Sequence, residues 1–147
     1  MEGQNSNFAS VIIVDVETTG VHAIGDVILQ IAASSAYSDS AEMFSIFINP
    51  VRDEINPFIT NLTGISKKKN GSMFVKEAPV ASEPLATALK LFLSYLERQP
   101  LPVMLVAHNA AFDAKFLLRA FSNCNLLDRF LTNIAGFSCS LAAARQH

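Results

Sequence analysis

The chain has 147 residues, the length of a single domain, and half of its residues are hydrophobic while 16% are charged, a composition that excludes intrinsic disorder. The net charge of −2 excludes a global positive field that would attract nucleic acid, so any such binding must come from local groups or a metal. No apolar run is long enough to span a membrane, and the two cysteines indicate reduced thiols in an intracellular protein, cytoplasmic or nuclear.

Three strand-like segments follow a polar N-terminal tail at residues 1–7. They cover residues 8–16, 27–33 and 42–49, and a proline follows the third. The first segment is nearly all apolar, which predicts a central strand buried on both faces. The connections between the three segments are short, which favours antiparallel neighbours.

An irregular stretch separates these strands from the first long helix. Residues 58–62 are expected to form a short helix with a proline in its first turn, and residues 66–72 a basic, polar loop. Ser82 is expected to cap the long helix, whose apolar side chains repeat at helical spacing as far as Leu96.

The last part of the chain alternates strands and helices. Residues 103–107 predict a short buried strand that is parallel to the first, because a helix separates the two. Asn109 can cap the next helix, residues 137–140 predict a last strand, and residues 141–145 predict the start of a further helix. This order of elements predicts an α/β fold, in which a mixed sheet has flanking helices.

Two carboxylates lie near the end of the first predicted strand. Asp15 and Glu17 are two positions apart, so both side chains point to the same face of that strand. Like charges in this arrangement repel each other unless a cation lies between them, and Mg²⁺ or Mn²⁺ prefers oxygen ligands. The pair therefore predicts a divalent-metal site.

A second group of polar residues follows the fourth predicted strand. His108, Asn109 and Asp113 would lie beside the first pair if the two strands are parallel neighbours, because their carboxyl ends then meet. Carboxylates that hold two metal ions are a common arrangement for cleaving phosphodiester bonds. Thr18 and Thr19, in the tight exit from the first strand, are candidates for contacts with a phosphate or a sugar.

Five stretches of the sequence carry a family resemblance. They are Asp-x-Glu-Thr-Thr-Gly at residues 15–20, Val-Ala-His-Asn-Ala-Ala-Phe-Asp at 106–113, Asn-Leu-Thr-Gly-Ile at 61–65, and the stretches 95–109 and 137–141. Together they resemble the DEDD 3′→5′ exonucleases, and within that family they are most similar to the three-prime repair exonucleases. The resemblance implies a ribonuclease H-like fold with a mixed five-stranded sheet and flanking helices.

The resemblance also implies a role for each matched residue. Asp15 would bridge two Mg²⁺ or Mn²⁺ ions, Glu17 would bind the catalytic ion, and Asp113 would support the second ion through water. The substrate would be the 3′ end of a nucleic acid, with single-stranded DNA favoured, and the resembling enzymes are typically homodimers. The residues expected around the terminal nucleotide are Thr18, Thr19, Leu62, Ile65, His108, Asn109 and Phe112.

One motif of that family is missing from the sequence. It is a histidine followed five residues later by an aspartate, placed after the last helix-rich segment. Beyond Asp113 the one histidine is His147, and Cys139 lies where relatives commonly have an aspartate. We therefore expect an exonuclease domain at residues 8–147 that is C-terminally incomplete, with weak or no activity. The chain would be a fragment, a truncated gene model or a degenerate copy.

Two other functions fit some of the same residues. A non-catalytic domain of the same fold, which binds nucleic acid or acts as a scaffold, would account for the missing histidine and carboxylate. A phosphatase or another enzyme of small-molecule phosphoryl transfer would also use an acidic Mg²⁺ site, with a nucleophilic aspartate and a second aspartate two positions later. That second position is Glu17 in this chain, which disfavours the phosphatase.

Overall fold

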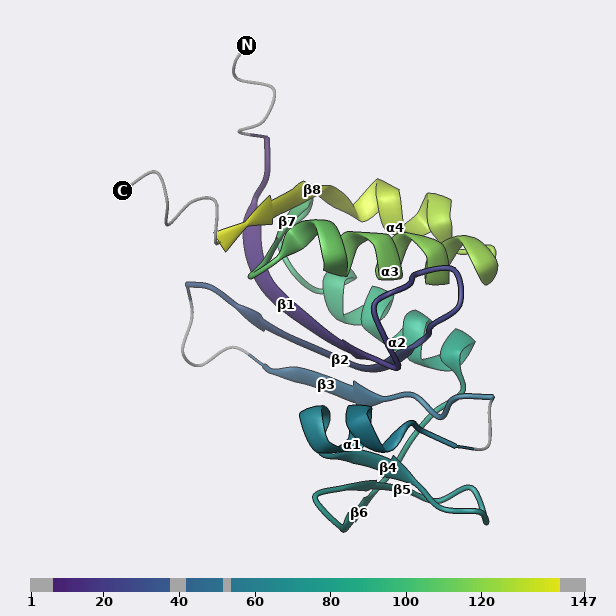
Figure 1. Cartoon of the computed structure of the whole chain (residues 1–147). Helices are drawn as coiled ribbons and strands as arrows, with labels where there is room; N and C mark the ends of the chain where they lie inside the picture. The colour runs from purple at the N-terminus through teal and green to yellow at the C-terminus, as the bar shows by residue number, and fades with distance from the viewer. Residues whose placement is uncertain (1–6, 38–41, 52–53, 141–147) are drawn as a thin grey trace.

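A mixed five-stranded sheet forms the centre of the computed structural model, which describes residues 7–37, 42–51 and 54–140. Its strand order is β3-β2-β1-β7-β8 (Figure 1). These strands are β1 (Ser10–Thr18), β2 (Ile28–Ser35), β3 (Phe44–Phe47), β7 (Val103–Ala107) and β8 (Ile134–Cys139). A smaller sheet contains β4 (Ile65–Lys67), β5 (Met73–Val75) and β6 (Ala78–Val80). The helices are α1 (Pro57–Thr63), α2 (Leu85–Glu97), α3 (Ala110–Asn123) and α4 (Leu127–Asn133).

The pairing of the strands follows from the connections between them. β1 pairs antiparallel with β2, and β2 with β3, as the short links predict. β1 pairs with β7 in parallel, because α2 precedes β7 and returns the chain to the starting end of the sheet. The predictions of an α/β architecture and of a parallel pair at the centre of the sheet are confirmed.

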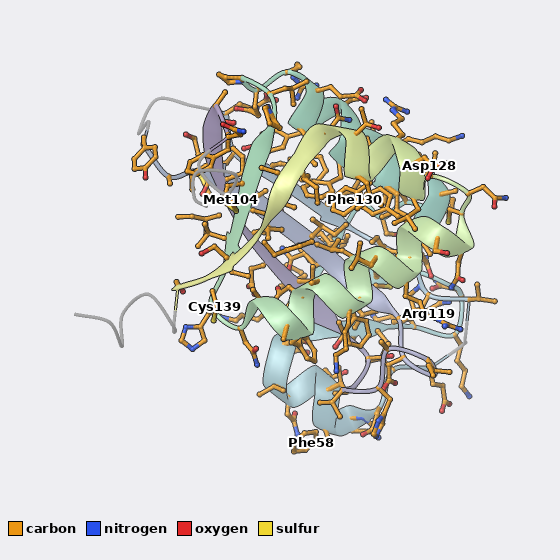
Figure 2. All side chains as sticks on the ribbon, turned by 90° about the horizontal axis from the view of Figure 1, so that it is seen from above. Phe58, Met104, Arg119, Asp128, Phe130 and Cys139 are labelled. Carbon is orange, nitrogen blue, oxygen red and sulfur yellow. The ribbon has the colours of Figure 1, made fainter. Side chains whose placement is uncertain are left out.

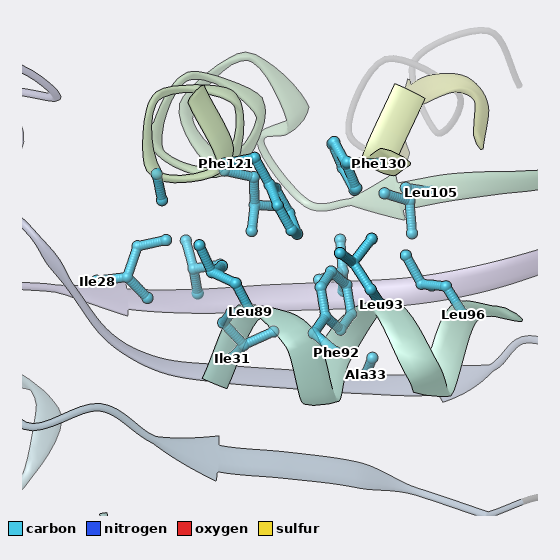
Figure 3. Close-up of a cluster of buried hydrophobic side chains, with 14 of the residues drawn as sticks. Ile28, Ile31, Ala33, Leu89, Phe92, Leu93, Leu96, Leu105, Phe121 and Phe130 are labelled. Carbon is cyan, nitrogen blue, oxygen red and sulfur yellow. The ribbon is translucent and has the colours of Figure 1, made fainter. Parts of the chain in front are cut away.

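One face of the large sheet is covered by three helices. β1 presents Ile12, Val14 and Val16 to this face, and each of them is at most 4% exposed. α2 meets these side chains with an apolar stripe at helical spacing, and α3 and α4 pack alongside (Figure 3). The side chains that α2 buries in this core include Leu89, Phe92, Leu93 and Leu96. The main core is therefore a single layer between the sheet and the helices.

The opposite face of β1 is open. Ile13 is 47% exposed, and Asp15 is exposed on the same face. The prediction of a strand buried on both faces is therefore wrong, although the strand itself is confirmed with its bounds moved two residues along the chain. The apolar composition of a strand does not reveal whether helices cover one of its faces or both. The open face is the one that carries Asp15 and Glu17.

A smaller apolar cluster attaches α1 and the small sheet to the large sheet. It joins Leu29 of β2 to Ile59 of α1 and to Met73 of β5. Figure 1 shows this unit beyond β3, at the bottom of the view. Of the lysine-rich segment 66–72, predicted to be a loop, residues 68–72 form the loop of the β4–β5 hairpin as predicted. Ser66 and Lys67 belong to β4 instead, because Ile65 and Met73 anchor both strands of the hairpin in the cluster.

The structure confirms the predicted start of α1 but not the predicted cap of α2. α1 has Pro57 in its first turn and ends at Gly64, whose φ of 79° is the left-handed conformation that favours glycine. α2 begins after Pro84 without a side-chain cap, so the prediction that Ser82 caps this helix is wrong. The Ser82 hydroxyl instead accepts a hydrogen bond from the Asn49 side-chain amide at 3.3 Å.

α4 is a helix that no sequence pattern predicts, because its seven residues are too few to show a clear period. Phe130 fixes it to the core by stacking on Phe121 of α3, with the ring centroids 4.1 Å apart (Figure 3). Figure 2 shows Phe130 on the inner side of α4. On the surface, Glu97 of α2 accepts two hydrogen bonds from Arg129 and one from Asn133. A buried aromatic pair and a surface ion pair thus hold α4 against its neighbours.

β8 completes the large sheet. It begins three residues before the predicted strand at 137–140 and pairs in parallel with β7. The predicted helix at residues 141–145 and His147 lie outside the described residues. None of the helices described is both long and apolar enough to cross a lipid bilayer.

Phe130→Ala is expected to destabilise the domain by about 3–5 kcal/mol, because it leaves a cavity in a fully packed core. Phe130 is fully buried, whereas Leu131 on the same helix is 47% exposed. Leu131→Ala is therefore the matched control, with an expected change of no more than about 0.5 kcal/mol. Urea titration measures both free energies of unfolding, and equal effects of the two substitutions would contradict this packing.

Arg129→Gln is expected to lower stability at neutral pH, with an effect that shrinks as the pH falls toward 2. The hydrogen bonds from Arg129 lower the pKa of Glu97 from 4.5 to about 2. A carboxylate with a lowered folded-state pKa stabilises the fold above its unfolded pKa, and this contribution is lost as the pH falls through the folded value. Urea midpoints of the wild type and the variant over this pH range measure the difference. A difference that stays constant over the range would contradict the pairing.

Candidate active site

The carboxyl ends of β1 and β7 meet at one edge of the sheet, as their parallel pairing requires. The ladder between the two strands runs from Ser10 to Ile13, and β1 continues beyond it. Past the ladder, the Val16 amide donates a hydrogen bond to Asp113 Oδ2 at 3.2 Å. This bond fixes the first turn of α3 to the residue that lies between Asp15 and Glu17.

Asp15, Glu17 and Asp113 form one electrostatic cluster. Burial raises the pKa of Glu17, and the negative charges of Asp15 and Asp113 raise it further. Asp113 is 5% exposed, and its burial raises the pKa of its carboxyl. The hydrogen bond from the Val16 amide lowers this pKa, and the negative charge of Asp15 raises it. The structure therefore places the three carboxylates that the sequence singles out within electrostatic range of one another.

The cluster has the oxygen donors and the unbalanced negative charge that suit a divalent cation. In the part of the chain that the structure describes, no lysine or arginine shifts the pKa of Glu17 or Asp113. Within the same residues, no three acidic, histidine or cysteine side chains are close enough together to hold an ion as they lie. The carboxylate oxygens are therefore suitable ligands for Mg²⁺ or Mn²⁺. Their side chains must move closer together to bind such an ion.

A largely apolar pocket of about 170 Å³ opens beside Glu17. Glu17 and Thr18 of β1 line it together with Phe58 and Leu62 of α1 and Phe112 of α3. Phe58 and Leu62 are 70% and 72% exposed and lie one turn apart on α1, so they form an accessible rim. The pocket thus contains three of the residues predicted to surround a terminal nucleotide, namely Thr18, Leu62 and Phe112.

The turn after β1 is held closed by Asp26. Its carboxylate accepts hydrogen bonds from the Thr19 hydroxyl and from the His22 amide, both at 3.0 Å. Thr19 is only 8% exposed and its hydroxyl also accepts from the Val27 amide, so the structure does not bring Thr19 to the pocket. A side chain at Gly20 would come within 2.4 Å of the same carboxylate, which explains the glycine at this position.

Three further residues predicted to contact a nucleotide lie away from the lining of this pocket. Ile65 is 1% exposed within the smaller apolar cluster, so its side chain supports the turn, and its place near a terminal nucleotide stays a prediction. His108 and Asn109 are exposed at the start of α3. Asn109 is the N-cap residue, but its side chain makes no capping bond. His108 lies close enough to Asp113 for its charge to lower the pKa of that carboxyl.

Phe58 and Val21 also line the pocket, although both lie outside the residues predicted to surround a nucleotide. Phe58 precedes Leu62 by four residues, and this spacing on a short helix is a signal that could have placed both on one face. Val21 carries no such signal, because its position depends on the turn that Asp26 closes.

Comparison with protein families identifies the chain. The exonuclease family model (RNase T) matches residues 12–133, a range that contains all three clustered carboxylates. The chain belongs to this exonuclease family. The resemblance to the DEDD exonucleases is thereby confirmed, and the narrower likeness to the three-prime repair exonucleases stays a prediction.

Relatives of this exonuclease domain include the PolC-type DNA polymerase III of Streptococcus pyogenes. The polymerase of serotype M18 is 35% identical over 119 residues, which cover 80% of this chain and 7% of the polymerase. That of serotype M2 is 37% identical over 110 residues, which cover 74% of this chain and 7% of the polymerase. The chain therefore spans only a small part of the length of these relatives.

Solved structures of E. coli exonuclease I share the fold. Its zinc-bound complex with single-stranded DNA gives a TM-score of 0.71 at 20% identity, over 94% of this chain and 29% of exonuclease I. Its complex with a dT13 oligonucleotide gives the same TM-score, 0.71, at 20% identity over the same shares of the two chains, 94% and 29%. These structures confirm the ribonuclease H-like fold class that the sequence predicts.

Mg²⁺ is expected to raise the Tm of this exonuclease domain, because a ligand that binds only the folded state stabilises it. Asp15→Asn should remove most of that rise. In EDTA the same variant should melt at a higher temperature than the wild type, because it lacks one of three mutually repelling charges. Differential scanning fluorimetry with and without MgCl₂ measures both effects.

Asp128→Asn is the matched control for this experiment, since Asp128 is an exposed acid on α4, outside the cluster. It should respond to Mg²⁺ as the wild type does. An equal rise of Tm in the wild type and in Asp15→Asn would show that the ion binds elsewhere.

Proposed function

We propose that this domain hydrolyses the terminal phosphodiester bond at DNA 3′ ends, with single-stranded DNA as its preferred substrate, and releases nucleotides one at a time. The observation that carries the proposal is the hydrogen bond from the Val16 amide to Asp113, because it gathers Asp113 with Asp15 and Glu17. Membership of the exonuclease family supports the reaction class. The likeness to a DNA polymerase and to exonuclease I bound to single-stranded DNA supports the choice of substrate.

Each carboxylate has a separate task in this proposal. Asp15, which is exposed, would hold both of two Mg²⁺ ions, Glu17 would hold the catalytic ion, and Asp113 would support the second ion through water. When bound, two Mg²⁺ ions would supply an activated water and stabilise the leaving oxygen. Because the Val16 amide fixes Asp113, the exposed Asp15 is the carboxylate that is free to move toward the ions.

The pocket beside Glu17 would receive the terminal nucleotide. Phe58 and Phe112 offer aromatic surfaces on which a base can stack, and Leu62 offers an apolar contact for the base or the sugar. A nucleotide held there would present its phosphate to the carboxylates, and such positioning is a large part of catalysis. Since a base in this pocket cannot be paired, single-stranded or frayed ends are the proposed substrates.

A non-catalytic domain that binds DNA is the second candidate. Beyond Asp113, the 147 residues contain no histidine followed five residues later by an aspartate. General acid–base catalysis by a positioned histidine raises the reaction rate by a factor of about 10² to 10⁴. We therefore propose that turnover by this chain is weak, and that binding without cleavage is the alternative function.

Shortening of a 5′-labelled oligo(dT) tests the proposal. With MgCl₂ the chain should produce a ladder of products shortened from the 3′ end, and with EDTA it should produce none. Asp15→Asn, Glu17→Gln and Asp113→Asn should each lower the rate about 10²-fold or more, because each removes a metal ligand. The same assay with MnCl₂ tests the choice of Mg²⁺ over Mn²⁺.

Asp128→Asn again serves as the control and should leave the ladder unchanged. A ladder of equal strength from Asp15→Asn would refute the proposed site. Binding of the oligonucleotide without shortening, in either metal, would establish the non-catalytic function. Hydrolysis of a small phosphate ester without shortening of DNA would indicate the phosphatase.

We also propose that the domain acts inside the cell, in the cytoplasm or the nucleus, where its substrate occurs. The family resemblance also implies a homodimer, which stays a prediction. Analytical ultracentrifugation of the purified chain measures its oligomeric state directly.

A further inference from the structure

The small sheet carries a concentration of positive charge. Residues 64–80 contain four lysines and one glutamate, in a chain whose net charge is −2. Figure 1 shows this sheet and α1 together, on the side of the molecule away from α3 and α4. The exonuclease chemistry proposed above uses none of these lysines.

The register of the small sheet separates an inner face from an outer one. Ile65 pairs with Val75, and both pack in the smaller apolar cluster, so their side chains face inward. Ser66 pairs with Phe74, and Phe74 with Pro79. Because side chains alternate along a strand, these three residues lie on the outer face.

Phe74 holds a lysine on that outer face. The Lys68 ammonium lies 4.3 Å from the centre of the Phe74 ring, within the range of a cation–π contact. Lys68 is exposed, so its charge is accessible to a ligand while the ring limits its motion.

Lys76 lies in the turn between β5 and β6, beside the end of α1. Its amide donates a hydrogen bond to the Gly64 carbonyl at 2.8 Å. Its Cγ would be 3.1 Å from a Cβ placed on Gly64. Both observations put Lys76 against the turn that follows Leu62.

A groove of about 490 Å³ lies beside this lysine and shares part of its lining with the active-site pocket. Leu62 and Thr63 line both the groove and the pocket. Ser66, on the outer face, and Lys76 also line the groove. The pocket and the groove therefore adjoin at Leu62 and Thr63, and the groove reaches Ser66 on the outer face of the small sheet.

We propose that this outer face, defined by Ser66, Lys68, Phe74 and Lys76, binds the phosphates of a single nucleic-acid strand upstream of its 3′-terminal nucleotide. The inference rests on the proposed function, because the end of the strand occupies the active-site pocket. β4 has three residues and so spans about 10 Å. Lys76 and Lys68, at its two ends, therefore contact different phosphates of one strand.

The positive charges on this surface favour a polyanion as its ligand. Because the groove adjoins the active-site pocket, a strand whose 3′ end lies in the pocket can also lie along the groove. Glu77 also lines the groove, next to Lys76, and its charge opposes such binding. Lysine contacts with phosphates release counterions, so the affinity should fall as salt rises. Removing a lysine charge from this surface should therefore weaken binding, whereas removing the charge of Glu77 should strengthen it.

Fluorescence anisotropy of 5′-fluorescein-labelled dT12 in EDTA measures binding without cleavage. Lys76→Gln and Lys68→Gln should each weaken binding about three- to tenfold at about 0.1 M salt, and each should reduce the logarithmic salt slope by about 0.7, the value for one phosphate of a single strand. Glu77→Gln should tighten binding. Lys68→Gln should weaken dT12 more than dT3, which is too short to reach Lys68 from the pocket.

Lys90→Gln is the matched control, since Lys90 is an exposed lysine on α2, outside the groove. If Lys76→Gln and Lys68→Gln weaken dT12 binding no more than Lys90→Gln does, the inference is overturned. An acidic peptide of equal charge that binds as tightly as dT12 would overturn nucleic acid as the partner.

The binding measurement separates this inference from the proposed function. Weaker dT12 binding by both lysine variants, in a chain that never shortens DNA, would support the binding face and refute the exonuclease. Unchanged binding by these variants, in a chain that does shorten DNA, would refute the binding face alone.

Discussion

The hydrogen bond from the Val16 amide to Asp113 is the contact on which the candidate site depends. Its two residues are 97 positions apart in the sequence, and they meet because β7 lies beside β1 and α3 begins shortly after β7. The stacking of Phe121 on Phe130 helps to hold α3 on the core. An unpaired buried carboxylate would be costly, so the same bond also makes the burial of Asp113 tolerable. One contact thus positions a functional group and stabilises it.

Much of the large sheet could be predicted, because each strand is a local apolar run and each link has a characteristic length. The same local rules located Asp15 and Glu17 on one face of a strand and Asp113 in the first turn of a helix. The rest depends on partners that are distant in sequence. Whether Ile13 is covered depends on where the helices pack, and whether Ile65 belongs to a strand depends on a cluster that includes Leu29.

Within the candidate site, the positions of single side chains also depend on contacts that the local sequence does not reveal. Thr18 and Thr19 are adjacent and chemically identical, so the sequence gives no reason to separate them. In the structure Thr18 lines the pocket, whereas Thr19 is bonded to Asp26. The difference comes from the closure of one turn, which local patterns do not encode. Phe58 is the opposite case, since its helical spacing from Leu62 was visible in the sequence.

The two apolar clusters differ in size, and the active-site pocket lies where they meet. The strand that carries Asp15 and Glu17 packs in the larger cluster, together with α2 and α3. Phe58 and Leu62 lie on α1, whose one buried residue is Ile59, in the smaller cluster. Local opening occurs first where few apolar contacts must break. The rim of the pocket can therefore yield when the proposed nucleotide enters and leaves, while the strand that carries Asp15 and Glu17 keeps its position, because the two parts of the site are held by different clusters.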